Sequence, residues 1–134
     1  KSALIDRFLY GTYAQHQKGA TYTLASRKTK RKKMCSNALE VQFKIWELSQ
    51  LSRYTMYAEW FYAHANCVII TIEQGDSMAK RRVEGILADL EDRQSASTID
   101  TLVVAVVVTK VDKHHESNKL IEQLCKEKKL LYFK

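Results

Sequence analysis

The sequence predicts an α/β fold, a doubly wound and mostly parallel sheet with one antiparallel edge strand. Residues 102–108 are seven consecutive apolar residues, five of them valine. A β-branched run with no polar face suits a strand covered by helices on both sides. Residues 67–72 form a second apolar run, and helical patterns alternate with these runs. Such alternation is typical of parallel sheets.

Length and composition fit one globular domain spanning residues 1–134. The chain is 46% hydrophobic and 28% charged, and no apolar run approaches the roughly 18 residues of a membrane span. Cys35, Cys67 and Cys125 are scattered, without a CxxC pair, which favours reduced thiols in a cytoplasmic protein. The chain opens without methionine and stops directly after an apolar run. We therefore expect it to be a fragment.

The first half predicts a helix and a pair of strands. Residues 1–11 read as an amphipathic helix that Ser2 can cap and Gly11 can end. Its expected apolar face consists of Leu4, Ile5, Phe8 and Leu9. Residues 21–26 are a possible strand, and residues 38–46 alternate strictly between apolar and polar side chains. This alternation indicates a half-exposed strand, and the polar connection implies an antiparallel pair.

A basic cluster from Arg27 to Lys33 supplies most of the net charge of +7, because six of its seven residues are basic. We expect it in a loop between the two strands. One interpretation is a solvated extension of that loop. A second is attachment to an anionic membrane, worth roughly 1 kcal/mol per basic residue near the surface. Nucleic-acid binding is less well supported, because no aromatic residues interleave with the charges.

The second half predicts alternating helices and strands. Residues 59–64 suggest a short helix, and Asp76 or Ser77 can cap a longer one. The apolar stripe of that longer helix consists of Val83, Ile86, Leu87 and Leu90. A last helix near residues 116–128 is expected to turn four residues inward: Leu120, Ile121, Leu124 and Cys125. Residues 130–133 read as a final strand.

Three short motifs resemble those of Ras-like GTP-binding proteins. Thr109-Lys110-Val111-Asp112 lies at the carboxyl end of the valine-rich strand, where α/β sheets bind ligands. It resembles the guanine-recognition motif Asn-Lys-x-Asp, in which the Rho branch uses threonine. Residues 1–4, Lys-Ser-Ala-Leu, resemble the end of the phosphate-binding loop. Residues 41–47 are similar to the Rab strand that ends Ile-Trp-Asp, and the Rab pattern continues to residue 74.

The resemblance implies GTP or GDP with Mg²⁺ as ligands. Lys1 would bind the β and γ phosphates, and Ser2 would place its hydroxyl on Mg²⁺. Asp112 would accept hydrogen bonds from N1 and N2 of guanine, a donor pair that adenine lacks. Lys110 would lie along the base, and Tyr13 would stack on its other edge.

The hydrolytic positions of the family are altered. The second-switch motif Asp-Thr-Ala-Gly-Gln-Glu becomes Glu-Leu-Ser-Gln-Leu-Ser here. Glu47 is one methylene longer than the aspartate, and Gln50 replaces a glycine whose amide reaches the γ phosphate. Leu51 replaces the glutamine that orients water, and the switch-one threonine falls at Ala20, beside Thr21. We expect little or no intrinsic hydrolysis.

Several functions agree with this resemblance. Leu24, Trp46 and Phe61 fall where Rab proteins present a hydrophobic patch to effectors, although such aromatic residues are also common in cores. We expect a switch or scaffold in intracellular membrane traffic, bound peripherally to membranes through the basic cluster. The alternatives are a nucleotide-free pseudo-GTPase subunit of a larger assembly and a nucleic-acid binder on the same fold.

Overall fold

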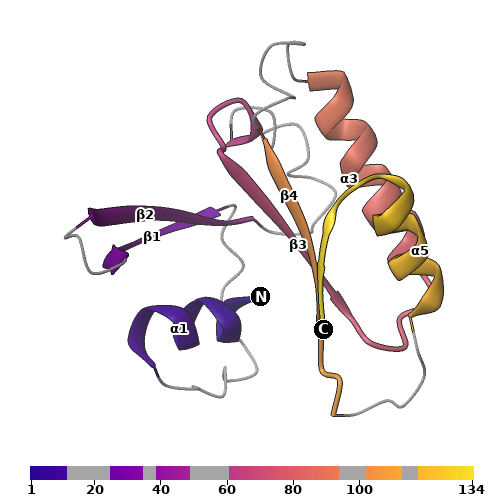
Figure 1. The fold of residues 1–134 in the computed structure, drawn as a ribbon, viewed down its shortest axis with the longest axis horizontal. Helices are drawn as coiled ribbons and strands as arrows, with labels where there is room; N and C mark the ends of the chain where they lie inside the picture. Colours follow the sequence, from indigo (N-terminus) through magenta and orange to yellow (C-terminus); the bar gives the residue numbers. More distant parts are fainter. Residues whose placement is uncertain (12–24, 35–38, 49–60, 94–101, 113–117) are drawn as a thin grey trace. The chain divides into compact units, whose positions relative to one another are not determined.

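The computed structural model describes residues 1–11, 25–34, 39–48, 61–93, 102–112 and 118–134 (Figure 1). The chain forms two compact units, Lys1–Ala58 and Glu59–Lys134. Each unit has its own sheet, two-stranded in the first and three-stranded in the second. Within the described ranges, no helix has both the length and the apolar composition needed to cross a bilayer.

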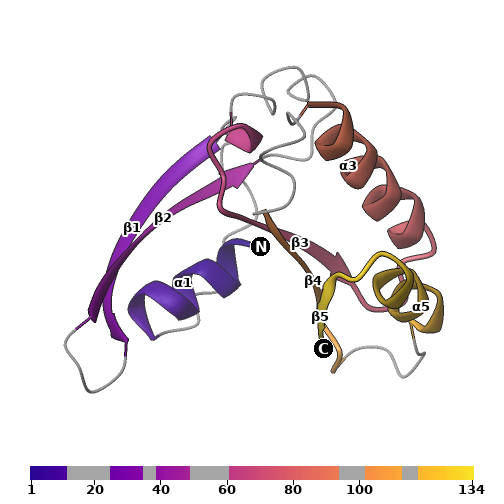
Figure 2. The ribbon, with the colours of Figure 1, turned by 45° about the horizontal axis from the view of Figure 1, so that its top comes forward.

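The first unit consists of helix α1 (Ser2–Tyr10) and a ribbon of β1 (Ala25–Met34) and β2 (Leu39–Leu48) (Figure 2). The two strands are antiparallel, as predicted, and run in register from Ala25 opposite Leu48 to Met34 opposite Leu39. The predicted helix end at Gly11 is confirmed. Gly11 has φ 73°, and its amide donates to the Arg7 carbonyl at 3.0 Å. Glycine adopts this left-handed cap without a steric cost.

The predicted cap of α1 is wrong: Ser2 is the first helical residue and makes no side-chain cap, and its hydroxyl donates to the Glu47 carboxylate instead. The predicted apolar face is confirmed in part, because Ile5 and Leu9 are half-buried, but Leu4 and Phe8 remain 45% and 37% exposed, whereas Asp6 is buried. Two contacts hold α1 to β2. The Ser2 bond fixes one end, and an edge-to-face contact of Phe8 with Phe43, with ring centroids 5.4 Å apart, fixes the other.

The predicted loop at the basic cluster is also wrong, because residues 27–33 lie within β1. The predicted alternation of β2 is confirmed: Val41, Phe43 and Ile45 are half-buried, whereas Gln42 and Lys44 are exposed. Strand pairing uses backbone groups, so a regular neighbour can impose strand structure on a charged segment. Lysine-rich edge strands are common, since their charge discourages further pairing.

The second unit is a parallel α/β unit, which confirms the predicted fold class. Its elements are β3 (Cys67–Glu73), α3 (Ala79–Arg93), β4 (Val103–Thr109), α5 (Lys119–Glu127) and β5 (Leu131–Phe133). The strand order is β3-β4-β5, and both pairings are parallel. The predicted apolar strands are therefore confirmed within one or two residues. Residues 61 and 62 are helical, within the short helix expected there.

Helices α3 and α5 both pack on one face of the three-stranded sheet (Figure 1). The core joins side chains of β3 and β4 to the predicted α3 stripe and to the buried face of α5: Ile70, Ile72, Val106, Val108, Val83, Leu87, Ile121, Leu124 and Cys125. Leu120 is 66% exposed, so its predicted inward position is wrong, because α5 turns its neighbour Ile121 inward.

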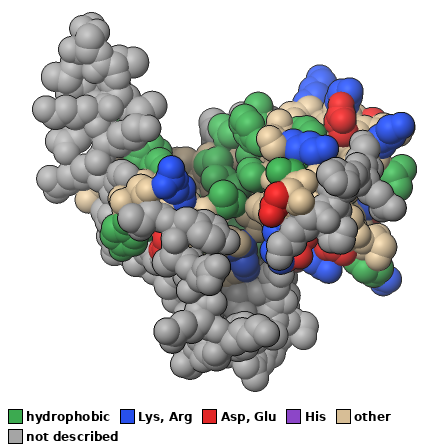
Figure 3. Space-filling model, turned by 90° about the horizontal axis from the view of Figure 1, so that it is seen from below, with side chains coloured by type: hydrophobic (Ala, Val, Ile, Leu, Met, Phe, Trp, Pro, Cys, Tyr) green, Lys and Arg blue, Asp and Glu red, His purple; other side chains and the backbone are tan. Residues whose placement is uncertain are grey.

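The strands are less completely covered than their apolar sequences predicted. Ile69 of β3 is 62% exposed and Phe133 of β5 is 53% exposed. Figure 3 shows hydrophobic side chains reaching the surface among charged ones on one side of the molecule. In β3 the buried residues Ile70 and Ile72 are flanked by the exposed Ile69 and Glu73 and separated by the half-buried Thr71, which is the pattern of a strand with one well-covered face.

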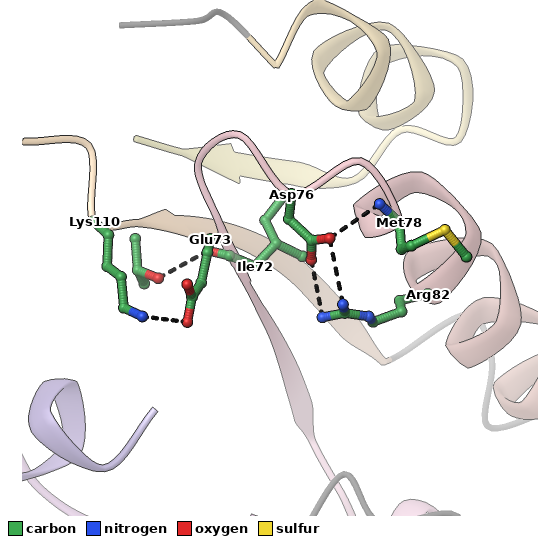
Figure 4. Close-up of polar contacts among 7 residues, drawn as sticks. Ile72, Glu73, Asp76, Met78, Arg82 and Lys110 are labelled. Carbon is green, nitrogen blue, oxygen red and sulfur yellow. Dashed lines mark hydrogen bonds and ion pairs between the residues drawn. The ribbon is translucent and has the colours of Figure 1, made fainter. Parts of the chain in front are cut away.

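Asp76 stabilises the start of α3, as the sequence predicted (Figure 4). The Met78 amide donates to Asp76 Oδ1 at 3.0 Å. Arg82 contacts both carboxylate oxygens, with Nη1 2.9 Å from Oδ2 and Nη2 3.3 Å from Oδ1. The carboxylate therefore accepts from the amide of the residue directly before α3 and pairs with a cation in the first turn of that helix.

We expect Asp76→Ala to lower the free energy of unfolding by about 1 kcal/mol, since it removes both contacts. Urea denaturation followed by circular dichroism measures this change. The control is Asp92→Ala, at an exposed position in the last turn of α3, where a carboxylate is unfavourable for the helix dipole. Equal losses in the two variants would contradict the capping role.

Candidate functional site

One group of predicted site residues, in the first unit, lies at the start of α1. Lys1 directly precedes the helix, and its carbonyl accepts from the amides of Leu4 and Ile5 at 3.0 and 3.2 Å. Its ammonium donates to the Leu48 carbonyl at 2.5 Å. Burial lowers the pKa of Lys1, and the nearby Glu47 carboxylate partly opposes that shift. A cation beside amides at a helix N-terminus is suited to an anionic ligand.

Ser2 and Glu47 bring a hydroxyl and a carboxylate into direct contact across α1 and β2. Mg²⁺ binds oxygen ligands at about 2.1 Å in an octahedral shell, so adjacent ligands lie about 3 Å apart. Two oxygens within hydrogen-bonding distance can therefore belong to one such shell. The donor set fits Mg²⁺, with Ser2 as ligand and Glu47 beside it, and the longer glutamate side chain still reaches the serine.

Another group of predicted site residues, in the second unit, lies at the carboxyl ends of β3 and β4. The Thr109 hydroxyl donates to the Ile72 carbonyl at 2.8 Å, and the Gln74 amide donates to the Thr109 carbonyl at 2.9 Å. The ammonium of Lys110 pairs with the carboxylate of Glu73 (Figure 4). Lys110 has φ 59°, a left-handed conformation that is uncommon for lysine. Contacts to β3 thus hold the first two residues of the motif.

Asp112 follows in a turn and is exposed, so its carboxylate is accessible to a ligand. The motif therefore has two parts. Thr109 and Lys110 contact β3, whereas the side chains of Val111 and Asp112 are exposed at the surface.

Glu73 is the residue that sequence reasoning missed. It ends β3 and is the register partner of Thr109. A signal was available, because a carboxylate that ends the strand beside the motif strand lies at the same sheet edge.

Six of the predicted site positions lie outside the described residues, and their roles stay predictions: Tyr13, Ala20, Thr21, Leu24, Gln50 and Leu51. Of the predicted effector patch, Trp46 is 41% exposed in the first unit and Phe61 is half-buried in the second. The phosphate positions Lys1 and Ser2 likewise belong to the first unit, and the guanine motif belongs to the second.

Comparison with known proteins identifies the family. Residues 1–112 match the family model described as "Ras of Complex, Roc, domain of DAPkinase". A search of curated proteins found no match. The matched span begins at Lys1 and ends at Asp112, so it contains both the phosphate positions and the guanine motif. The chain belongs to the Roc family and is a Ras-like, GTP-binding small GTPase domain.

Proposed function

We propose that this domain selects guanine nucleotide and retains GTP with little or no intrinsic hydrolysis. The observation that carries guanine selection is the Thr109–Asp112 motif at the end of β4, with Thr109 and Lys110 held by β3. Asp112 accepts hydrogen bonds from N1 and N2 of guanine. Glu73 orients the Lys110 side chain along the base.

Residues at the start of α1 are proposed to bind the phosphates. The Lys1 ammonium neutralises charge on the β and γ phosphates, and its reduced pKa reflects the removal of this amine from bulk water. Ser2 and Glu47 are the oxygen donors for Mg²⁺, which when bound neutralises charge on the phosphates. Nucleotide binding requires Lys1 and Ser2 to exchange their present contacts with Leu48 and Glu47 for the ligand.

Those same contacts favour the alternative left by the sequence, a nucleotide-free pseudo-GTPase subunit. The two side chains assigned to phosphate and metal are each bonded to β2. A domain that had lost its ligand could retain such internal bonds, since they satisfy the exposed Lys1 ammonium and the half-buried Ser2 hydroxyl without a nucleotide. The two proposals differ in whether guanine nucleotide accompanies the purified protein.

Slow hydrolysis is proposed from Gln50, Leu51 and Ala20, which replace three groups that act on the same step. Phosphoryl transfer needs an oriented water, a backbone donor and a complete metal shell at one moment. Groups that act as a unit are non-additive, so repairing one leaves the barrier set by the others.

We therefore expect Leu51→Gln to change the single-turnover rate of GTP hydrolysis by less than about tenfold. The triple change Ala20→Thr, Gln50→Gly and Leu51→Gln should give more than the product of the three single effects. Rates are measured with GTP prebound to protein and started with Mg²⁺. A large recovery from Leu51→Gln alone would show that the other two positions are intact.

The biological role proposed for the domain is a Rab-like switch or scaffold in membrane traffic, cytoplasmic and peripheral on membranes. Support comes from the Rab-like strand at residues 41–47, from the exposed Trp46 and from the basic residues of β1. Trp46, Phe61 and Leu24 are the positions proposed to contact an effector protein.

A further inference from the structure

The register of the β1–β2 ribbon divides the basic cluster between two faces. Residues directly opposite in an antiparallel pair occupy the same face of a sheet. One set of basic positions pairs with apolar residues of β2: Lys28 with Ile45, Lys30 with Phe43 and Lys32 with Val41. The other set pairs with Trp46 and polar residues: Arg27 with Trp46, Arg31 with Gln42 and Lys33 with Glu40.

Helix α1 contacts β2 on the first of these faces. Phe8 packs edge-to-face on Phe43, and Ser2 bonds to Glu47 two positions beyond Ile45 on the same side of β2. Figure 2 shows α1 lying along the ribbon. The opposite face, termed the outer face, is defined by Arg27, Thr29, Arg31 and Lys33 of β1 and by Glu40, Gln42, Lys44 and Trp46 of β2.

The outer face combines dispersed positive charge with one exposed tryptophan. Gln42 and Lys44 are exposed, and Trp46 is 41% exposed. Four of the eight outer positions are basic and one, Glu40, is acidic. Ten residues of strand extend about 33 Å, so these groups are spread along a long, narrow surface. Tryptophan is enriched where a protein meets the headgroup region of a bilayer, because its ring has an apolar body and a polar tip.

We propose that the outer face binds an anionic phospholipid surface, with Trp46 inserted at headgroup level and Arg27, Arg31, Lys33 and Lys44 beside the lipid phosphates. The charge of this face is complementary to anionic lipid. Single-stranded nucleic acid is the weaker partner, since its binding uses several aromatic residues as stacking platforms and this face has one. This inference rests on the proposed membrane role, which names the anionic membrane as the partner. It adds which face of the ribbon, and which residues, contact that membrane.

Two matched triple variants test the face directly. One changes Arg27, Arg31 and Lys33 to Gln, and the other changes Lys28, Lys30 and Lys32 to Gln. Both remove three charges from the same seven residues of β1 and differ only in the face affected. Each is assayed by co-sedimentation with vesicles of two parts phosphatidylcholine to one part phosphatidylserine, and with phosphatidylcholine alone.

The first triple should lose on the order of a hundredfold in vesicle affinity, because each basic residue near the surface contributes about fivefold and three are removed. The second should lose less than about fivefold, because its positions lie on the α1 side. GTP affinity is measured in parallel and should not change in either variant. Failure of GTP binding in the parent would concern nucleotide selection alone. Failure of vesicle binding in the parent would overturn the proposed membrane role together with this inference, whereas equal losses in the two triples would overturn only the choice of face.

Trp46 provides a second readout. In a Trp60→Phe background, Trp46 is the single tryptophan of the chain, and its emission should shift to shorter wavelength on vesicle binding. Equal losses in the two triples, or an unchanged emission, would overturn the face assignment. Binding of a fluorescent single-stranded oligonucleotide without binding of vesicles would overturn the choice of partner.

Discussion

Asp112→Asn is expected to weaken GTP binding by at least about a hundredfold and to increase the affinity for xanthosine triphosphate. The carboxylate accepts from both N1 and N2 of guanine, and hydrogen bonds to a charged group contribute about 1.5–3 kcal/mol each. The amide of asparagine presents one acceptor and one donor. Xanthine carries a carbonyl in place of the N2 amine, so it matches that pair. In guanine the N2 amine would instead face the asparagine amide, donor against donor.

Competition between a fluorescent guanine nucleotide and GTP, ATP or xanthosine triphosphate measures this switch. Asp92→Asn, a charge-matched change at an exposed position of α3, is the control and should leave all three affinities unchanged. Because Asp112 is exposed in a turn, its replacement should not alter the melting temperature. Equal affinity of the parent for ATP and GTP would contradict guanine recognition by this motif.

Lys1→Ala is expected to weaken the binding of every nucleoside triphosphate, again by at least about a hundredfold, because it removes a charge-assisted contact to phosphate. Its signature differs from that of Asp112→Asn: GTP and xanthosine triphosphate should weaken by the same factor, since the base is not involved. Lys1 makes no side-chain cap on α1, so the helix should be retained.

Lys80→Ala is the matched control for this change, at an exposed lysine of α3 that pairs with Glu84. Affinities are compared by the same competition assay, and helix content by circular dichroism. If Lys1→Ala binds GTP like the parent, Lys1 is not the phosphate lysine and the start of the chain is wrongly matched to the phosphate loop.

The sequence predicted the helices and strands that are marked by a hydrophobic pattern within their own residues. β3 and β4 follow from continuous apolar runs, and α3 follows from a stripe at helical spacing after Asp76. An antiparallel partner for β2 was predicted, but at residues 21–26; the extension of β1 through residues 27–33 could not be predicted, because it depends on pairing with β2 and these charged residues by themselves favour a loop.

The candidate site residues likewise divide into those recognisable from a contiguous motif and those whose contacts join distant parts of the sequence. The motif of Thr109 and Asp112 is contiguous in sequence and could be recognised from four residues. The contacts that hold it, and those of Lys1 and Ser2, join residues 35 to 47 positions apart. No local pattern reports a bond such as Ser2 to Glu47, since it exists only after α1 packs against β2.

Identification of the nucleotide that accompanies the purified protein tests the central claim most directly. The protein is purified in the presence of Mg²⁺ and denatured, and its released nucleotides are separated by chromatography and quantified against protein. Guanine selection with slow hydrolysis predicts close to one guanine nucleotide per chain, with GTP a substantial fraction. Release of no nucleotide, or of adenine nucleotide, would contradict it.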